Sequence, residues 1–408
     1  PGERHPRETC RKEFSPLEAL FLTITLISVS MWVGLLLLPW RPWRNREVLE
    51  AEGSGKGERL GDVTVLIPAR NEAEVIGRTM ASVAAQGADL KILLIDDCST
   101  DGTADHARQA AGEPLRILPG KPLPGGWGGK LWALEQGRRL VDTPMTLLLD
   151  ADIELAPGIL GALRAAMRKE GLPFVSLMAM PPMGSFREKL LMPAFVYFFK
   201  LLYPFALANK PSSKIAAAAG GCILLETRLL EEMGGFETMK DAVIDDCELA
   251  RRVKSSGNRI WVGLSRSVRS VRPYGSLREI GNMVARTAYT QLRYSPALLV
   301  LCTLAMGVAF WVPIVAMFSM NAAVMWLAAG AMLAMVLSYL PTLGFTGRSR
   351  IWALCLPMIA TFYLFITWTS AIRYWKGERT RWKGRIYDGC MELGNATLRE
   401  TANLDPNE

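Results

Sequence analysis

The stretch Leu147-Leu148-Leu149-Asp150-Ala151-Asp152 predicts a buried strand that ends in two carboxylates. Three consecutive leucines are typical of a parallel strand that is covered on both faces. In an open α/β sheet, ligands bind beyond the carboxyl ends of the strands. Aspartates at positions i and i+2 suit a hard divalent cation whose remaining ligands are water and phosphate. A turn with two solvated aspartates explains the triplet equally well when it is taken alone.

Two further acidic clusters follow predicted strands upstream of this one. They come after the strands expected at 63–68 and 92–95, and they contain Glu72 and Asp97. A third strand is expected at 115–118. The alternation of short apolar strands with helices predicts a parallel sheet, so the three acidic clusters converge on one edge. Helix capping accounts for each cluster separately, but three clusters on one edge favour a nucleotide site.

The amino-acid composition indicates which partners and which kinds of catalytic or metal site this chain can have. Half of the 408 residues are hydrophobic, and the formal net charge of +8 indicates an anionic partner such as lipid headgroups, phosphates or nucleic acid. The seven cysteines form no CxxC pair, which argues against a zinc ribbon or a disulfide framework and fits a reducing compartment. There are two histidines, His5 and His106, so we expect any general base to be a carboxylate.

The segment 124–130, Pro-Gly-Gly-Trp-Gly-Gly-Lys, predicts a glycine-rich loop that ends in Lys130. It fails the P-loop pattern, because Pro124 takes the place of the first glycine and Leu131 replaces the Ser or Thr that holds magnesium. A loop that presents Lys130 to a diphosphate is still reasonable, since backbone amides and an ammonium suit anionic oxygens. A plain surface turn is the alternative.

Apolar runs long enough to cross a bilayer, which takes about 20 residues, flank the α/β region. The expected organisation is an N-terminal tail (1–16), a transmembrane helix (17–40), a linker (41–62), an α/β domain (63–295), three apolar membrane segments (296–372), and a basic, then polar tail (373–408). The apolar segment 190–207 is interrupted by Lys200 and Pro204. We expect it to be either an interfacial or re-entrant element or a buried core helix. Because basic residues flank the spans, we expect a lipid bilayer as partner and no nucleic acid.

In order and spacing, these motifs resemble those of family 2 glycosyltransferases. Their catalytic domain has the GT-A fold, a Rossmann-like α/β domain with a mostly parallel sheet. The segments that carry the resemblance lie at 65–72, 96–103, 129–134 and 150–152. The resemblance implies a nucleotide-sugar donor, with a UDP-sugar expected, and a divalent metal, Mg²⁺ or Mn²⁺, as cofactor.

The resemblance also implies roles for individual residues. Glu72 and Asp97 would hold the nucleoside, and Lys130 would lie near the uracil or the diphosphate. Asp150 would face the nucleotide, and Asp152 would face the metal.

A further acidic motif at 244–252 resembles the family's Glu-Asp motif, with Asp245 in place of glutamate. The resemblance implies that Asp246 is the general base. It would deprotonate an acceptor hydroxyl during a one-step inversion while the metal stabilises the leaving charge. A helix N-terminal cap is a compatible structural explanation. The small-residue segment 216–222 would line the acceptor cleft.

The QxxRW motif of processive family members is incomplete here. Thr290 occupies the position of its glutamine, and Gln291 is one place off, which weakens the case for polysaccharide synthesis. Arg286 and Arg293 either contact phosphate or the acceptor, or form a basic face against lipid headgroups.

Segments between about residues 60 and 300 resemble the bacterial glycosyltransferases associated with hopanoid biosynthesis; they lie at 175–179, 193–199, 202–206, 216–222 and 286–296. This resemblance implies a membrane lipid acceptor, such as a polycyclic triterpenoid. The positive charges beside the spans do not agree on one topology. We expect a multi-pass protein of the inner (plasma) membrane whose catalytic domain faces the cytoplasm, because nucleotide sugars are made there. A nucleotidyltransferase on the same α/β platform and a non-catalytic membrane scaffold are the alternatives.

Overall fold

The computed structural model describes residues 15–53, 58–112, 115–382 and 385–388. Residues 1–14 of the N-terminal tail expected at 1–16, and much of the tail expected at 373–408, therefore lie outside the described residues.

An eight-stranded, mostly parallel sheet forms the centre of the α/β domain. Its strands follow one another in the order β3 (Leu115–Pro119), β2 (Lys91–Asp96), β1 (Val63–Ala69), β4 (Met145–Leu149), β7 (Cys222–Glu226), β6 (Phe174–Met180), β8 (Trp261–Ser270) and β5 (Ile153–Leu155). Strand β7 runs antiparallel to both of its neighbours, and β5 runs antiparallel to β8. The prediction of a mostly parallel sheet is confirmed, and the carboxyl ends of β1, β2 and β4 share one edge.

Helices cover both faces of this sheet. They are α2 (Ala73–Ala84), α3 (Thr103–Ala111), α4 (Gly129–Arg138), α5 (Ile159–Glu170), α8 (Thr227–Glu232) and α9 (Asp245–Ser255), with the 3₁₀ helix η1 (Gly235–Met239) between the last two. Along β1, Val65 belongs to the core on one face with Ile76 of α2 and Leu163 of α5. Its neighbour Leu66 belongs to the core on the other face with Leu134 of α4. Successive side chains of a strand point to opposite faces, so a strand covered on both faces is a continuous apolar run.

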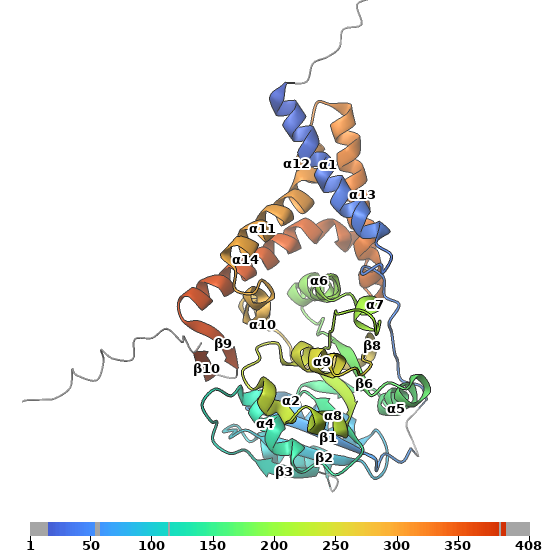
Figure 1. Cartoon of the computed structure of the whole chain (residues 1–408), viewed down its shortest axis with the longest axis vertical. Coiled ribbons are helices and arrows are strands. Elements are labelled where there is room, and N and C mark those ends of the chain that lie inside the picture. Colours follow the sequence, from blue (N-terminus) through green and yellow to red (C-terminus); the bar gives the residue numbers. More distant parts are fainter. Residues whose placement is uncertain (1–14, 54–57, 113–114, 383–384, 389–408) are drawn as a thin grey trace, which may run out of the picture.

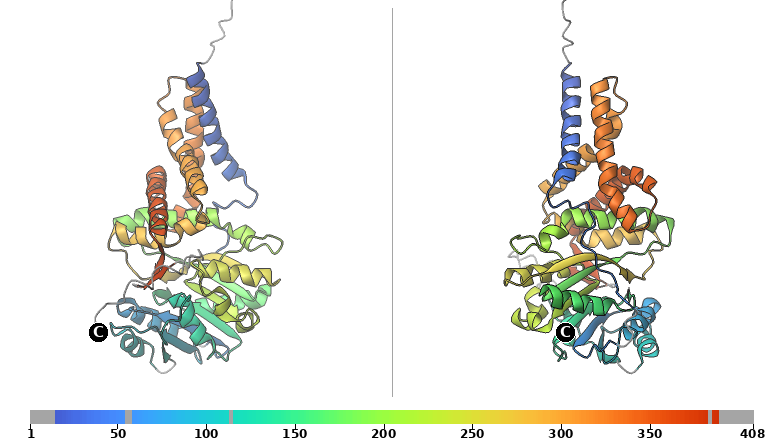
Figure 2. Two further views of the ribbon diagram at one scale, coloured as in Figure 1. Left: turned by 60° about the vertical axis from the view of Figure 1, so that its left-hand side comes forward. Right: turned by 90° about the vertical axis from the view of Figure 1, so that its right-hand side faces the viewer.

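A layer of helices lies between the α/β domain and a projecting stalk of helices (Figure 1). The layer contains α6 (Phe186–Leu202), α7 (Phe205–Ala208), α10 (Leu277–Gln291) and α14 (Leu356–Trp375). The stalk contains α1 (Pro16–Leu37), α11 (Pro296–Met306), the π-helix η2 (Gly307–Trp311), α12 (Val312–Ala316) and α13 (Ala322–Phe345). The 3₁₀ helix η3 (Arg350–Cys355) precedes α14, and a hairpin of β9 (Glu378–Trp382) and β10 (Arg385–Asp388) follows it. The two views of Figure 2 show α1 beside α13.

Five helical stretches of the described chain are long and apolar enough to cross a membrane. They are Pro16–Leu37, Phe186–Ala208, Pro296–Ala316, Ala322–Phe345 and Arg350–Trp375. Four of them coincide with the spans expected from the sequence.

The additional stretch, Phe186–Ala208, contains the segment expected to be interfacial, re-entrant or a core helix. It packs against other helices. The Tyr197 hydroxyl lies 2.7 Å from the Ser338 hydroxyl of α13, and the Tyr363 hydroxyl of α14 donates to the Leu191 carbonyl over 3.0 Å.

The linker that follows α1 is fastened to strand β8. The backbone of Leu264 donates to the Glu47 carbonyl (2.8 Å) and accepts from Leu49 N–H (3.1 Å), which adds a short parallel pairing beside β8. The Glu50 carboxylate accepts hydrogen bonds from the backbone N–H (2.9 Å) and the hydroxyl (2.7 Å) of Ser267. These hydrogen bonds connect α1, through the linker, to β8, whose last residues lie at the carboxyl edge of the sheet.

We expect the chain to stay in the membrane fraction after washes with high salt and with alkaline carbonate, because several of its helices are apolar and of spanning length. A protein held at the surface by its positive charge is released by salt. The measurement is an immunoblot of pellet and supernatant after each wash. Release by carbonate would show that these helices do not span the bilayer.

Candidate active site

The acidic residues expected from separate strand ends lie at one edge of the sheet. Glu72 and Asp97 follow β1 and β2, and Asp150 and Asp152 follow β4. The pair Asp245–Asp246 begins α9 (Figure 1), which brings two more carboxylates to the same edge.

Lys130 joins two of these acidic groups. Its Nζ lies 2.7 Å from Asp150 Oδ1 and 3.4 Å from Asp245 Oδ2. The residue lies in the first turn of α4 rather than on the preceding loop, where the sequence led us to expect it. Burial alone would lower the pKa of Lys130, but the surrounding carboxylates outweigh it and raise that pKa, so the ammonium stays charged.

Asp246 is held by two backbone amides. Gly220 N–H donates to its Oδ2 (2.6 Å), and Cys247 N–H donates to its Oδ1 (2.7 Å). A Cβ at position 220 would lie 3.3 Å from both Asp246 Oδ2 and Lys130 Nζ, so glycine allows this close approach. Burial, followed by the charge of Asp245, raises the pKa of Asp246 to about 6. Its carboxylate is therefore mostly ionised at neutral pH and still basic enough to accept a proton.

Sequence analysis missed Arg272, which follows β8. Its guanidinium donates through Nη2 to Glu72 Oε2 and through Nε to Asp152 Oδ2, the latter over 3.2 Å. The hydroxyl of Ser270 donates to the same Asp152 oxygen over 3.2 Å. One cation thus bridges the acid expected to hold the nucleoside and the acid expected to hold the metal.

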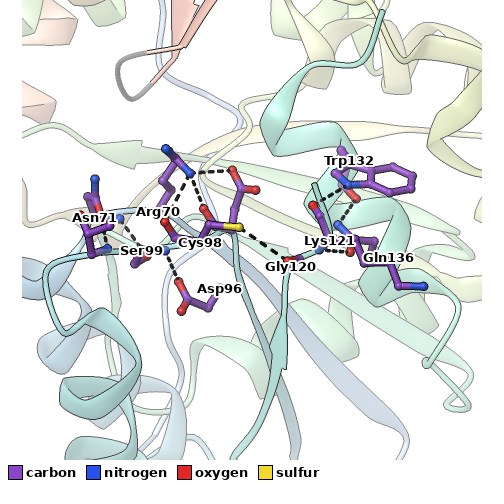
Figure 3. Close-up of polar contacts among 11 residues, drawn as sticks. Arg70, Asn71, Asp96, Cys98, Ser99, Gly120, Lys121, Trp132 and Gln136 are labelled. Atoms are coloured by element: carbon purple, nitrogen blue, oxygen red, sulfur yellow. Dashed lines mark hydrogen bonds and ion pairs between the residues drawn. The ribbon is translucent and has the colours of Figure 1, made fainter. Parts of the chain in front are cut away.

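Hydrogen bonds link the loops after β1, β2 and β3 (Figure 3), including one from the Cys98 thiol to the Gly120 carbonyl over 3.6 Å. Arg70 Nη1 donates to the Asp97 carbonyl over 2.5 Å and lies 3.7 Å from its Oδ2. Asn71 N–H donates to the Ser99 hydroxyl over 3.0 Å. These contacts hold Asp97, whose side chain is fully buried, in a fixed position.

The two arginines proposed for phosphate or acceptor binding lie apart from these contacts. Arg286 is on α10, within electrostatic range of Tyr274, and Arg293 is an exposed residue of the loop that follows, with φ = 51°. In the described part of the chain, no ion pair joins either arginine to a carboxylate of the site.

Residues 64–234 match the family described as "Glycosyl transferase family 2". The chain carries a glycosyltransferase family 2 domain. The matched residues include Glu72, Asp97, Lys130, Asp150 and Asp152, and they end before the α9 acids.

Two curated relatives that the chain matches carry the name 4,4'-diaponeurosporenoate glycosyltransferase. The one from Staphylococcus haemolyticus is 27% identical over 113 residues, which is 28% of this chain and 30% of the relative. The one from Staphylococcus aureus (strain USA300) is 29% identical over 128 residues, which is 31% of this chain and 32% of the relative. The chain therefore spans about a third of the length of the curated relatives that it matches.

Among solved structures, the chain is similar to a mannosyltransferase from Pyrobaculum calidifontis, determined in complex with GDP-Man and Mn²⁺. The two share 19% identity with a TM-score of 0.51, over 88% of this chain and 100% of the other. This likeness shows the fold, so the GT-A fold expected for the domain is confirmed.

The carboxylates of the family 2 domain fit a divalent metal as part of a larger complex. Among the described residues, no group of three or more acidic, histidine or cysteine side chains is arranged to hold an ion without other ligands. Mg²⁺, however, is commonly bound by one or two carboxylates together with water and substrate phosphates. Asp152 supplies oxygen ligands of the right kind at the strand end, so the donor set fits a metal that arrives with a diphosphate.

We expect Asp152→Ala to lower metal-dependent nucleotide binding at least about 100-fold, because outer-shell changes alone cost 10–100-fold in metal affinity. The fold should survive, since this side chain is partly exposed and lies in the turn between β4 and β5. Calorimetry with MnCl₂ and UDP or GDP measures the loss. The control is Glu154→Ala. It removes a carboxylate that lies two residues after Asp152 and pairs with Arg78. Normal metal-dependent binding by Asp152→Ala would show that the metal ligand lies elsewhere.

Proposed function

We propose that the chain is a membrane-bound, inverting glycosyltransferase that transfers a sugar from a nucleotide-sugar donor to a lipid acceptor. The observation that carries this proposal is the position of Lys130, whose ammonium reaches Asp150 on one side and Asp245, next to Asp246, on the other. Lys130 thus links the acids that we assign to the donor, which lie within the residues that match glycosyltransferase family 2, with the acidic pair at the start of α9 that we assign to the acceptor.

The donor half of the proposed site consists of residues from the strand ends. Glu72 and Asp97 hold the nucleoside, and Asp150 faces the nucleotide. Lys130 lies beside the diphosphate, where its ammonium attracts the phosphate oxygens. Asp152 would hold the divalent metal, Mg²⁺ or Mn²⁺, which neutralises the charge on the leaving diphosphate when it is bound. A UDP-sugar is the proposed donor.

The acceptor half is built around Asp246. Its carboxylate takes the proton of the acceptor hydroxyl as that oxygen bonds to the anomeric carbon of the sugar. The bond from the anomeric carbon to the diphosphate oxygen breaks in the same step, and the nucleoside diphosphate leaves with the electron pair. Attack from the face opposite the leaving group inverts the configuration at this carbon.

The helical layer beside the site supports a lipid acceptor. Tyr203, at the end of α6, donates from its hydroxyl to Gln291 Oε1 of α10 over 2.8 Å and also interacts with Cys247, the residue after the proposed base. The helical layer thus extends, through Tyr203, to the residue next to Asp246, the proposed base. The curated relatives are named for a diaponeurosporenoate, and the acceptor that we propose here is likewise a membrane lipid, related to the hopanoids.

The proposed location is the inner (plasma) membrane, with the catalytic domain on the cytoplasmic side, where nucleotide sugars are made. Arg286 and Arg293 lie on α10 and in the loop after it. We propose that they bind the phosphates of lipid headgroups or of the acceptor.

We expect Asp246→Asn to lower the transfer rate about 10²–10⁴-fold, which is the usual contribution of a general base, while donor affinity stays nearly unchanged. Asparagine keeps the size of the side chain and an oxygen for one of the two backbone amides. The measurement combines calorimetry of nucleotide binding with transfer of labelled sugar from UDP- and GDP-sugars to extracted membrane lipids. Release of nucleoside diphosphate, rather than pyrophosphate, separates glycosyl transfer from nucleotidyl transfer.

The matched control is Asp245→Asn, which removes the neighbouring carboxylate. The pH profile provides a second readout. Because the folded-state pKa of Asp246 is raised to about 6, the wild-type rate should fall as the pH drops through that value and the base becomes protonated. A normal rate for Asp246→Asn beside an inactive Asp245→Asn would place the base one residue earlier.

A further inference from the structure

Arg272 donates a hydrogen bond to the carboxylate of Asp152, the residue that the proposed function assigns to the metal. The guanidinium and the Ser270 hydroxyl both donate to Asp152 Oδ2, each over 3.2 Å. The other end of the guanidinium pairs with Glu72, a residue with 7% of its surface exposed. A cation of the chain itself therefore neutralises two of the acids of the proposed donor site.

A divalent cation at Asp152 conflicts with this arrangement. Asp152 Oδ2 already accepts two hydrogen bonds, and a metal ion at either oxygen would bring two cations close together in a partly buried site. Repulsion between charges rises as the surroundings exclude water. The metal and the Arg272–Asp152 contact are thus alternatives.

The backbone around Arg272 is fixed on both sides, so the side chain is the part that can move. Val271 N–H donates to the Asp152 carbonyl over 2.8 Å, and Tyr274 N–H donates to Glu188 Oε1 of α6 over 2.7 Å. Arg187 Nη1, also on α6, donates to the Gly275 carbonyl over 2.9 Å. A rotation of the arginine side chain releases Asp152 while the strand end stays in place.

We propose that Arg272 is a placeholder cation. It occupies Asp152 while the donor site is empty, and it moves from Asp152 to the donor diphosphate when the metal and the nucleotide bind. The inference rests on the proposed function, because it assumes a metal–diphosphate ligand at this edge of the sheet. A guanidinium suits this second position, since its planar set of N–H groups matches phosphate oxygens in pairs.

This exchange couples the binding of metal to the binding of nucleotide. Metal alone must displace Arg272 from Asp152 without offering it another anion. When metal and a diphosphate bind together, the metal binds Asp152 and the diphosphate oxygens become a new partner for the Arg272 guanidinium. The protein should therefore bind metal weakly by itself and much more tightly in the presence of the nucleotide, and the coupling is reciprocal by linkage.

The experiment measures Mn²⁺ binding by electron paramagnetic resonance and UDP or GDP binding by calorimetry, each with and without the other ligand, on the full chain in detergent. The variants are Arg272→Gln, which keeps hydrogen-bond donors and loses the charge, and Arg272→Lys, which keeps the charge and loses the planar group. The matched control is Arg78→Gln, which removes an arginine from an exposed pair with Glu154 (2.8 Å) outside the site. Thermal melting of each variant confirms that it is folded.

We expect Arg272→Gln to bind Mn²⁺ alone about tenfold more tightly than the wild type, because Asp152 is no longer occupied. The same variant should bind UDP or GDP in the presence of Mn²⁺ about tenfold more weakly, because the diphosphate has lost a partner. Arg272→Lys should lie between the two, and Arg78→Gln should match the wild type.

The outcomes separate this inference from the proposed function. Unchanged or weaker Mn²⁺ binding by a folded Arg272→Gln, beside a wild type that binds Mn²⁺ and nucleotide together, overturns the placeholder role and leaves the function standing. A wild type that binds neither nucleotide with Mn²⁺ overturns both.

Discussion

Repulsion among the carboxylates gathered at one edge of the sheet is the constraint on which the site depends. Parallel strands bring Asp97 and Asp150 together, and α9 adds Asp245 and Asp246. Acids placed so close in a buried site disfavour one another's ionisation: burial first, and then the charge of Asp245, raise the pKa of Asp246. Lys130, in the first turn of α4, and Arg272, which follows β8, partly offset this cost by pairing with Asp150, Asp245, Glu72 and Asp152.

Strand β8 connects this charge balance to the rest of the molecule. Near its middle, Glu50 of the linker accepts hydrogen bonds from Ser267, and the linker leads back to α1. At its end, the backbone beside Arg272 is held by Asp152 and by Glu188 of α6. The same strand thus contacts the linker of the first membrane-type helix, the helical layer and the donor side of the site. A rigid strand of this kind keeps the site in register with the helices that would face the lipid.

Local sequence patterns predicted the sheet and much of the acidic edge, because short apolar runs and the acids after them are neighbours in the chain. The contact of Arg272 with Asp152 could not be predicted, since 120 residues separate the two and they meet through the pairing of β8 with β5. The segment Ser270-Val271-Arg272 has no local signal of a site. Lys130 was expected on a loop because glycines precede it, but the backbone turns into α4 one residue earlier, which aims its ammonium at the acids.

The central claim is that the acidic edge binds a metal together with the diphosphate of a nucleotide. The most direct test is a structure of the detergent-purified chain with UDP and Mn²⁺, in which anomalous scattering locates the manganese. The account predicts manganese bonded to the Asp152 carboxylate, the diphosphate between it and Lys130, and the uridine on the side of Asp97 and Glu72. Nucleotide bound away from this edge, or manganese without contact to Asp152, would contradict it.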